Sequence, residues 1–153
     1  MTTDGTSIEG DAPDARRPRI SGLYATWRGT EYYARFVRDN LYIYTRETPL
    51  PAGFKTSVLS FFAGQLRVPG NEIDKLIRLE SICKYRAESF EITNIVGDIA
   101  YLNYRGESLV RVALWPNMEQ TDKYEVQGEA PLAELTDLEE VKTELPLPDQ
   151  DSR

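Results

Sequence analysis

The sequence predicts an all-β protein, mainly strands with short helical turns, built as two tandem small modules. Short segments rich in aromatic and β-branched residues recur along the chain, separated by tight turns that contain Gly, Asp or Asn. The order of these segments in the first half is repeated in the second half, which indicates an internal duplication.

The duplication begins with two matching blocks. Residues 27–32 read WRGTEY and residues 85–90 read YRAESF, which is in both cases an aromatic residue, Arg, a small residue, two polar residues and an aromatic residue. Each block is followed by an alternating segment, a polar break and a second strand-like segment. That second segment is LYIY at 41–44 and AYLNY at 100–104.

A third block closes each half with a proline-led turn. It reads Pro, two residues, Glu, a branched apolar residue, two residues and Leu, beginning at Pro69 and again at Pro131. Proline has a pre-set φ and lacks the N–H that a first helical turn leaves unpaired, and Glu there meets the positive end of the local dipole. We therefore expect a single 3₁₀ or α turn, whose apolar residues close the end of the module.

Each module begins with a three-stranded meander. In the first module Arg28–Thr30 and Arg38–Asn40 supply the turns. The predicted strands are residues 23–27, 32–37 and 41–44 in the first module and 82–85, 90–95 and 99–104 in the second, where the segment Ser108–Trp115 predicts one strand more.

Short strands, tight turns and a proline-led turn before a last strand give an order that resembles a Src-homology-3-like barrel. The resemblance covers residues 21–145 as two copies and concerns topology, so it carries no ligand-binding residues. It implies barrel modules at 20–80 and 81–145, between flexible tails at 1–19 and 146–153. One larger, curved antiparallel sheet made from both halves is the alternative. Modules of about 60 residues bury limited surface, so we expect the two to pack together.

The apolar stretch Ser57–Ala63 has no counterpart in the second module. We expect it to form a strand or short helix at the contact between the modules, and a patch that binds a partner is the alternative. The chain also has nine tyrosines. Because Tyr32, Tyr33, Tyr42 and Tyr44 place rings on both faces of neighbouring strands, some of these rings are expected at the surface or at an interface.

The composition argues against catalysis. The chain has no histidine, which excludes Ser-His-Asp and Cys-His arrangements and conventional zinc sites. Cys83 stands alone in an alternating run and is interpreted as a small core or strand residue. No phosphate-binding glycine loop or nucleophile elbow is present, and no pair of carboxylates stands in a context that would raise a pKa. We expect a non-enzymatic protein without cofactor or metal.

The sequence predicts neither a membrane span nor a secretory signal. No stretch approaches the ~20 apolar residues that span a bilayer, and the N-terminus has no apolar segment typical of a secretory signal. The single cysteine cannot form an internal disulfide. We expect a cytosolic protein without a membrane partner.

The negative charge is concentrated near the end of the chain. Residues 121–153 hold three basic and ten acidic side chains, net −7, which equals the net charge of the whole chain. Such charge repels nucleic acid and attracts a basic protein, and a tail that only maintains solubility is the alternative. The candidate partner-binding residues are Glu119, Asp122, Tyr124, Glu125, Glu129, Asp137, Glu139 and Glu140.

The layout WRG-x-x-Y followed by LYIYT, with a second half that ends in a proline-led turn and DLEEVKTEL, is similar to immunity proteins of bacterial toxin systems, in particular those of actinobacteria. The resemblance implies an antitoxin that occludes the basic active-site cleft of a toxin or enzyme domain in a 1:1 complex. The candidate acids would supply the charge and tyrosines the apolar anchors.

Two further hypotheses belong to other classes. The chain could be an intracellular adaptor that binds peptides through a barrel groove or an exposed sheet edge. It could also be a small enzyme that uses carboxylates alone, which would require a pocket holding at least two acids with shifted pKa values.

Overall fold

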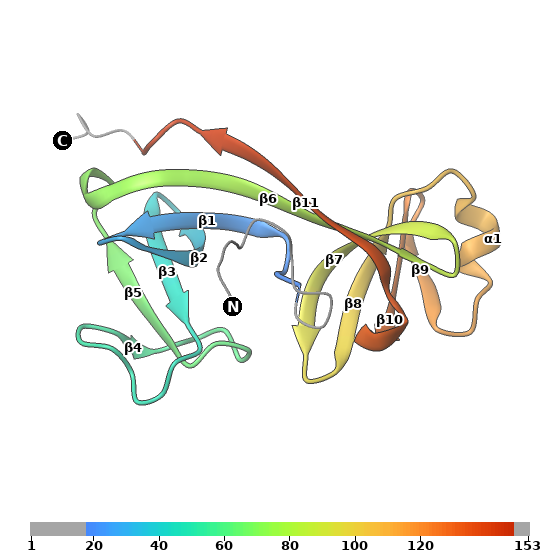
Figure 1. The fold of residues 1–153 in the computed structure, drawn as a ribbon, viewed down its shortest axis with the longest axis horizontal. Helices are drawn as coiled ribbons and strands as arrows, with labels where there is room; N and C mark the ends of the chain where they lie inside the picture. The colour runs from blue at the N-terminus through green and yellow to red at the C-terminus, as the bar shows by residue number, and fades with distance from the viewer. Residues whose placement is uncertain (1–17, 149–153) are drawn as a thin grey trace, which may run out of the picture. The chain divides into compact units, whose positions relative to one another are not determined.

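The computed structural model describes residues 18–148, which form β-strands, 3₁₀ turns and one short α-helix (Figure 1). This confirms the predicted all-β class. The chain divides into two compact units. The N-terminal unit consists of Gly22–Leu79 and the residues from Lys142 onward, and the C-terminal unit consists of Glu80–Val141 and the residues up to Ser21.

The N-terminal unit is an antiparallel sheet whose strands pair in the order β4-β5-β3-β2-β1-β6. The three predicted strands of the first meander are confirmed as β1 to β3. The bounds are β1 Gly22–Trp27, β2 Thr30–Val37, β3 Asn40–Thr45, β4 Lys55–Thr56, β5 Gly64–Val68 and β6 Ile73–Tyr85.

The C-terminal unit continues from β6 in the order β6-β7-β8-β10-β9, and β11 pairs with β6. Strand pairing therefore passes through β6, as expected of one antiparallel sheet made from both halves. The three predicted strands of the second meander are confirmed in β6, β7 and β8. The bounds are β7 Glu88–Val96, β8 Ile99–Tyr104, α1 Leu109–Ala113, β9 Met118–Asp122, β10 Glu125–Pro131 and β11 Thr136–Leu145.

The first hairpins of the two halves have the same backbone geometry. Arg28 and Gly29, between β1 and β2, have φ of 52° and 81°, and Arg86 and Ala87, between β6 and β7, have φ of 51° and 68°. Two-residue loops with positive φ at both positions match the right-handed twist of the flanking strands. The shared geometry supports the internal duplication.

The next hairpins and the proline-led turns also match. Arg38 and Gly97 occupy equivalent turns with φ of 61° and 60°. Pro69 and Pro131 each precede a 3₁₀ turn, as the sequence predicts. After the first turn, the apolar residues Ile73 and Leu76 lie in β6 and not in the turn. After the second, Leu135 caps the turn and Leu138 lies in β11. The two turns are Gly70–Glu72 and Leu132–Glu134.

One face of the N-terminal sheet carries its main core. Trp27 packs edge-on against Phe54 with ring centroids 6.4 Å apart, and its indole N–H donates a hydrogen bond of 3.1 Å to Glu72 at the proline-led turn. Leu145, near the end of β11, packs against the same cluster. The other buried members are Ala25, Ala34, Leu41, Ile43, Val68, Ile73 and Leu76.

The other face of this sheet is covered by the segment Ser57–Ala63, which is a turn and neither the strand nor the helix expected from its apolar residues. The Phe62 ring stacks on Tyr33 at 5.0 Å and lies 5.5 Å from Tyr44. Tyr33 and Tyr44 are consequently buried, whereas Tyr42 is half-buried. Part of the tyrosine content therefore serves the packing of this unit.

The core of the C-terminal unit is built on aromatic contacts. Phe90, which is fully buried, lies 5.3 Å from the Tyr104 ring and 5.9 Å from the Tyr85 ring. Trp115, which follows α1, packs against Phe90 and Tyr85 at 6.2 and 6.0 Å. Other buried residues are Cys83, Ile92, Leu102, Val112 and Val126.

The predicted strand at Ser108–Trp115 is wrong, because residues Leu109–Ala113 form helix α1. The Tyr104 hydroxyl accepts a 2.8 Å hydrogen bond from the backbone N–H of Ser108, which satisfies a donor at the helix start. A short helix places Val112 alone in the core and leaves Val110 and Leu114 exposed. Of the apolar residues that alternate in this segment, only Val112 is buried, so the alternation does not mark the buried face of a strand.

Most residues of the predicted tails lie outside the described residues. Of those described, Pro18 is buried, and Pro148 lies so close to Gly70 that a Cβ there would come within 2.8 Å of the proline Cβ.

Candidate functional site

The hairpin β9–β10 brings together four of the predicted acids in the C-terminal unit. Its residue pairs place Asp122 opposite Glu125 and Gln127 opposite Glu119. Glu129 lies two positions beyond Gln127, so it shares that outer face with Glu119. All four acids are exposed, and β9 pairs with no further strand in the sheet order. The result is an acidic edge, which we call the acidic hairpin (residues 118–131).

The tip of the acidic hairpin presents an aromatic ring. Tyr124 is 77% exposed. Its backbone N–H donates a 2.8 Å hydrogen bond to the Asp122 carboxylate, a local contact that fixes the turn. The Lys123 ammonium lies 5.5 Å from the centroid of the ring. Tyr124 therefore stands in solvent on a turn of defined conformation.

Asn117 fixes the other end of the hairpin. Its side-chain amide donates hydrogen bonds to the Tyr85 hydroxyl at 2.9 Å and to the Glu129 carbonyl at 2.8 Å. Gly128 faces the Asn117 carbonyl so closely that any Cβ at this position would collide with it. Glycine is required here by the close approach of two backbones.

A groove of about 440 Å³ runs beside the hairpin. Glu119 and Glu129 line it together with the apolar side chains of Pro116, Ile99 and Pro131. Carboxylates beside apolar side chains suit a basic side chain with a long aliphatic stem, since lysine and arginine bury the stem and keep the charge outside.

The three predicted acids on β11 differ from those of the hairpin. Asp137 and Glu139 are exposed on β11. Glu140 is held by Arg19, which donates two hydrogen bonds of 3.0 Å to its carboxylate, and the Glu140 side chain is only 6% exposed. Because Glu140 is paired with Arg19 of its own unit, its carboxylate does not belong to the exposed candidate surface.

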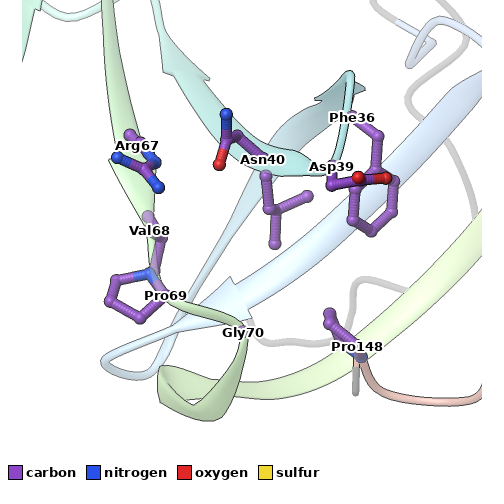
Figure 2. Close-up of a pocket in the computed structure, with 9 residues that line it drawn as sticks. Phe36, Asp39, Asn40, Arg67, Val68, Pro69, Gly70 and Pro148 are labelled. Carbon is purple, nitrogen blue, oxygen red and sulfur yellow. The ribbon is translucent and has the colours of Figure 1, made fainter. Parts of the chain in front are cut away.

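The N-terminal unit has a cleft of about 690 Å³ that sequence reasoning missed (Figure 2). Figure 2 shows Phe36 and Asp39 on one side and Arg67 and Val68 on the other. Pro148 lines the cleft from the C-terminal segment. The sequence signal for it is that Phe36 stands next to the end of β2, where the alternation would place its ring on the core side, and the structure leaves the ring exposed.

Glu88 and α1 are joined by a polar network. The Tyr104 hydroxyl donates a 2.7 Å hydrogen bond to one carboxylate oxygen of Glu88, and Arg111 of α1 bonds to the other. These two hydrogen bonds lower the pKa of Glu88, that of Tyr104 first. Burial and then the bond to Glu88 raise the pKa of Tyr104. A lowered carboxyl pKa is opposite to what a general acid at neutral pH needs.

The arginines that follow aromatic residues have two kinds of partner. Arg28 lies over the Trp27 ring at 4.2 Å, and Arg86 lies over the Tyr85 ring at 5.2 Å, so each guanidinium contacts the ring that precedes it at the hairpin. Arg105 instead bridges Glu91 at 3.0 Å and Glu80 at 3.5 Å. These contacts support the turns.

Within residues 18–148, no group of three or more Cys, Asp or Glu residues lies together so as to hold a metal ion. None of the helices in the same range has the length and apolar character needed to cross a membrane.

The fold and the site define an all-β protein of two units, with an exposed acidic hairpin in the second. The family model described as "Uncharacterised conserved protein UCP033725" matches residues 20–146, and the chain belongs to this family. Among curated proteins and among solved structures, no significant match to the chain was found.

Proposed function

We propose that the chain is a non-enzymatic protein-binding protein, and specifically an immunity protein that neutralises a cognate toxin by covering its active site. The observation that carries the proposal is the acidic hairpin, where Tyr124 stands exposed among four exposed acids. Tyrosine in a fixed turn offers a large contact area at small entropic cost, and interfaces are enriched in it.

The charge of the C-terminal unit supports a basic partner. Residues 80–141 contain thirteen acidic and five basic side chains, net −8, whereas residues 22–79 contain five acidic and eight basic side chains, net +3. The negative field is thus concentrated in the unit that carries the hairpin, where it would steer a basic surface toward Tyr124. A toxin that cuts or modifies nucleic acid has such a surface because its substrate is a polyanion.

The mechanism is occlusion. The carboxylates of Glu119 and Glu129 pair with basic residues that line the active-site cleft of the toxin, and the groove beside them receives the aliphatic stem of one such residue. Tyr124 fills an apolar pocket of the partner and excludes water from these pairs, which strengthens them. Substrate then cannot enter the cleft.

The test is co-purification of the chain with the product of the adjacent upstream gene, followed by isothermal titration calorimetry and an assay of the toxin. We expect a 1:1 complex with nanomolar Kd, loss of toxin activity, and about tenfold weaker binding when NaCl is raised from about 0.1 to about 0.5 M. Y124A and the double variant E119K/E125K should each weaken binding about tenfold.

The matched control is E47K/D74K, which makes the same change in net charge at two exposed acids of the N-terminal unit. It should alter affinity by less than about twofold at physiological salt, because neither acid belongs to the hairpin and exposed charges are screened by salt. Equal losses in both double variants would refute the hairpin as the binding surface. A complex that leaves the toxin fully active would refute the immunity role.

A peptide-binding adaptor is the second candidate, and the cleft of Figure 2 favours it. Pro148 already packs on Gly70 at this cleft, so its surface accommodates a proline from an extended segment. An adaptor would bind a Pro-Leu-Pro peptide with micromolar Kd, and Phe36→Ala would abolish that binding. Fluorescence anisotropy with a labelled peptide measures the Kd for the unaltered chain and the loss of binding in the Phe36→Ala variant.

A further inference from the structure

The N-terminal unit carries three exposed arginines on one face of its sheet. Arg35 on β2 lies opposite Tyr42 on β3, and Tyr42 lies opposite Arg67 on β5. Residues directly opposite in antiparallel strands project to the same face, so two guanidinium groups flank one half-buried ring. Arg46 follows β3 and reaches the same face, where its guanidinium lies 4.9 Å from the centroid of Phe62. We call this surface the arginine face (Arg35, Tyr42, Arg46, Phe61, Phe62 and Arg67).

Aromatic contacts hold two of the three guanidinium groups, those of Arg35 and Arg46, in place. Arg35 lies 5.5 Å from the Tyr33 centroid and 5.9 Å from that of Phe61, and its Nε donates a 3.0 Å hydrogen bond to the Tyr33 hydroxyl. A guanidinium stacked on a ring keeps its remaining N–H donors at the edge, in the plane that a carboxylate or phosphate group matches. Arg35 and Arg46 are therefore positioned for an oxyanion before any ligand arrives.

The described residues provide no carboxylate partner for these arginines. Across residues 18–148, no ion pair joins Arg35, Arg46 or Arg67 to an acid. The acids nearest in sequence, Asp39 and Glu47, are exposed. Three exposed cations on one face, with no carboxylate partner among residues 18–148, are the arrangement expected where the anion comes from another molecule.

We infer that the arginine face binds an acidic protein segment, with carboxylates seated on the guanidinium edges of Arg35, Arg46 and Arg67. A single-stranded nucleic acid fits less well, because base stacking needs free rings. Phe62 is already stacked on Tyr33 and contacted by Arg46. This surface lies in the other unit from the acidic hairpin, and the inference is independent of the proposed toxin partner.

The test uses the full chain, labelled with ¹⁵N, and hexaglutamate as the probe. At low salt we expect amide and arginine Nε–Hε shifts confined to β2, β3, β5 and residues 57–63, with binding lost at about 0.5 M NaCl. R35Q/R67Q should weaken binding about fivefold or more. R35K/R67K keeps the charge but not the stacked, bidentate geometry, and should weaken it to an intermediate extent.

The control R78Q removes an exposed charge from the same unit, opposite Leu23 on the other face, and should change affinity by less than about twofold. Amide spectra of the free variants show whether each is folded; where the double variant is not, R46Q alone provides the comparison. Absence of shifts with hexaglutamate, or equal weakening by R78Q, would overturn the inference. Tighter binding of a thymidine hexanucleotide would assign the face to nucleic acid, and self-association with the same shifts would assign it to a second copy of the chain.

Discussion

At the scale of single residues, burial determines what the reactive groups can do. Cys83 is 1% exposed, and burial raises the pKa of its thiol to about 12. Since the thiolate is the nucleophile, a thiol in this environment is inert. The prediction of a small core residue, made from the alternating run around it, is confirmed by this burial.

We predict that Cys83 does not react with Ellman's reagent in the native protein at pH 8. Its pKa lies well above that pH, and the reagent cannot reach a buried sulfur. Labelling followed by absorbance should show one thiol per chain only after urea is added. Native labelling at the speed of a free thiol would contradict the buried position.

Glu88 provides the second residue-scale prediction. Its folded pKa is lowered by its hydrogen bonds to Tyr104 and Arg111, so its stabilisation is fully present above the ordinary value of 4.5 and is lost as pH falls through the lowered pKa. E88Q should cost about 1 to 2 kcal/mol of unfolding free energy at pH 7, and this difference should shrink below about pH 4.5.

Urea titrations of E88Q and the unaltered chain at pH 7 and pH 3 measure both effects. E107Q, which changes an exposed acid beside the same helix, is the control and should be neutral within about 0.5 kcal/mol. An equal loss of unfolding free energy at both pH values would show that the charge of Glu88 does not contribute to stability.

At the scale of elements, the sequence predicts those strands and turns that are specified by residues close together in the chain. The six meander strands and the two proline-led turns are confirmed, because alternation, tight turns and proline act within a few residues. Helix α1 was mispredicted, since Ser108–Trp115 alternates like a strand while its start is fixed by Tyr104 from the preceding strand. The arginine face was missed because it depends on the register of β2, β3 and β5, which no local pattern specifies.

The residues of the candidate site also differ in whether neighbouring or distant parts of the chain determine their position. Glu119 and Glu129 lie together because a hairpin folds neighbouring sequence onto itself, so their proximity was within reach of sequence reasoning. Glu140 is buried against Arg19, a residue at the other end of the chain. No local sequence pattern indicates an ion pair between residues so far apart in the chain. The prediction that Glu140 belongs to the exposed surface was therefore wrong.

The repeated hairpin turn gives a prediction at the element scale. Ala87 has φ of 68° where the equivalent position of the first half, Gly29, has φ of 81°. A left-handed conformation costs an L-residue about 1 to 2 kcal/mol, partly offset in glycine by the entropy of its unfolded state. A87G should therefore stabilise the protein by about 0.5 to 1 kcal/mol, and G29A should destabilise it by a similar amount.

Denaturant midpoints of the two variants check this pair. Gly29 has no atom within 4 Å of an added Cβ, so the effect of G29A isolates the backbone term from steric collision. Effects of the same sign in the two variants would mean that the two loops do not share the geometry expected of a duplication.

At the scale of the whole molecule, the two units are not simple consecutive halves of the chain. Strand β6 begins in the N-terminal unit and ends in the C-terminal unit, and β11 begins in the C-terminal unit and ends in the N-terminal one. Leu145 of β11 thereby joins the core that contains Trp27. A fragment made of residues 20–80 lacks this side chain, so the first module of the predicted duplication is incomplete by itself.

The contact of Leu145 with the core of the N-terminal unit gives a prediction about stability. In a W115F background, Trp27 is the remaining tryptophan, and it reports on the core that Leu145 contacts. L145A removes part of an apolar side chain that is half-buried there and should lower the unfolding free energy by about 1 kcal/mol, seen by Trp27 fluorescence in urea. V141A, at a position 39% exposed in the same strand, is the control and should have less than half that effect. Identical midpoints for L145A and the parent would mean that the N-terminal core is complete without the end of β11. The two modules would then be separable folding units, as the duplication by itself suggests.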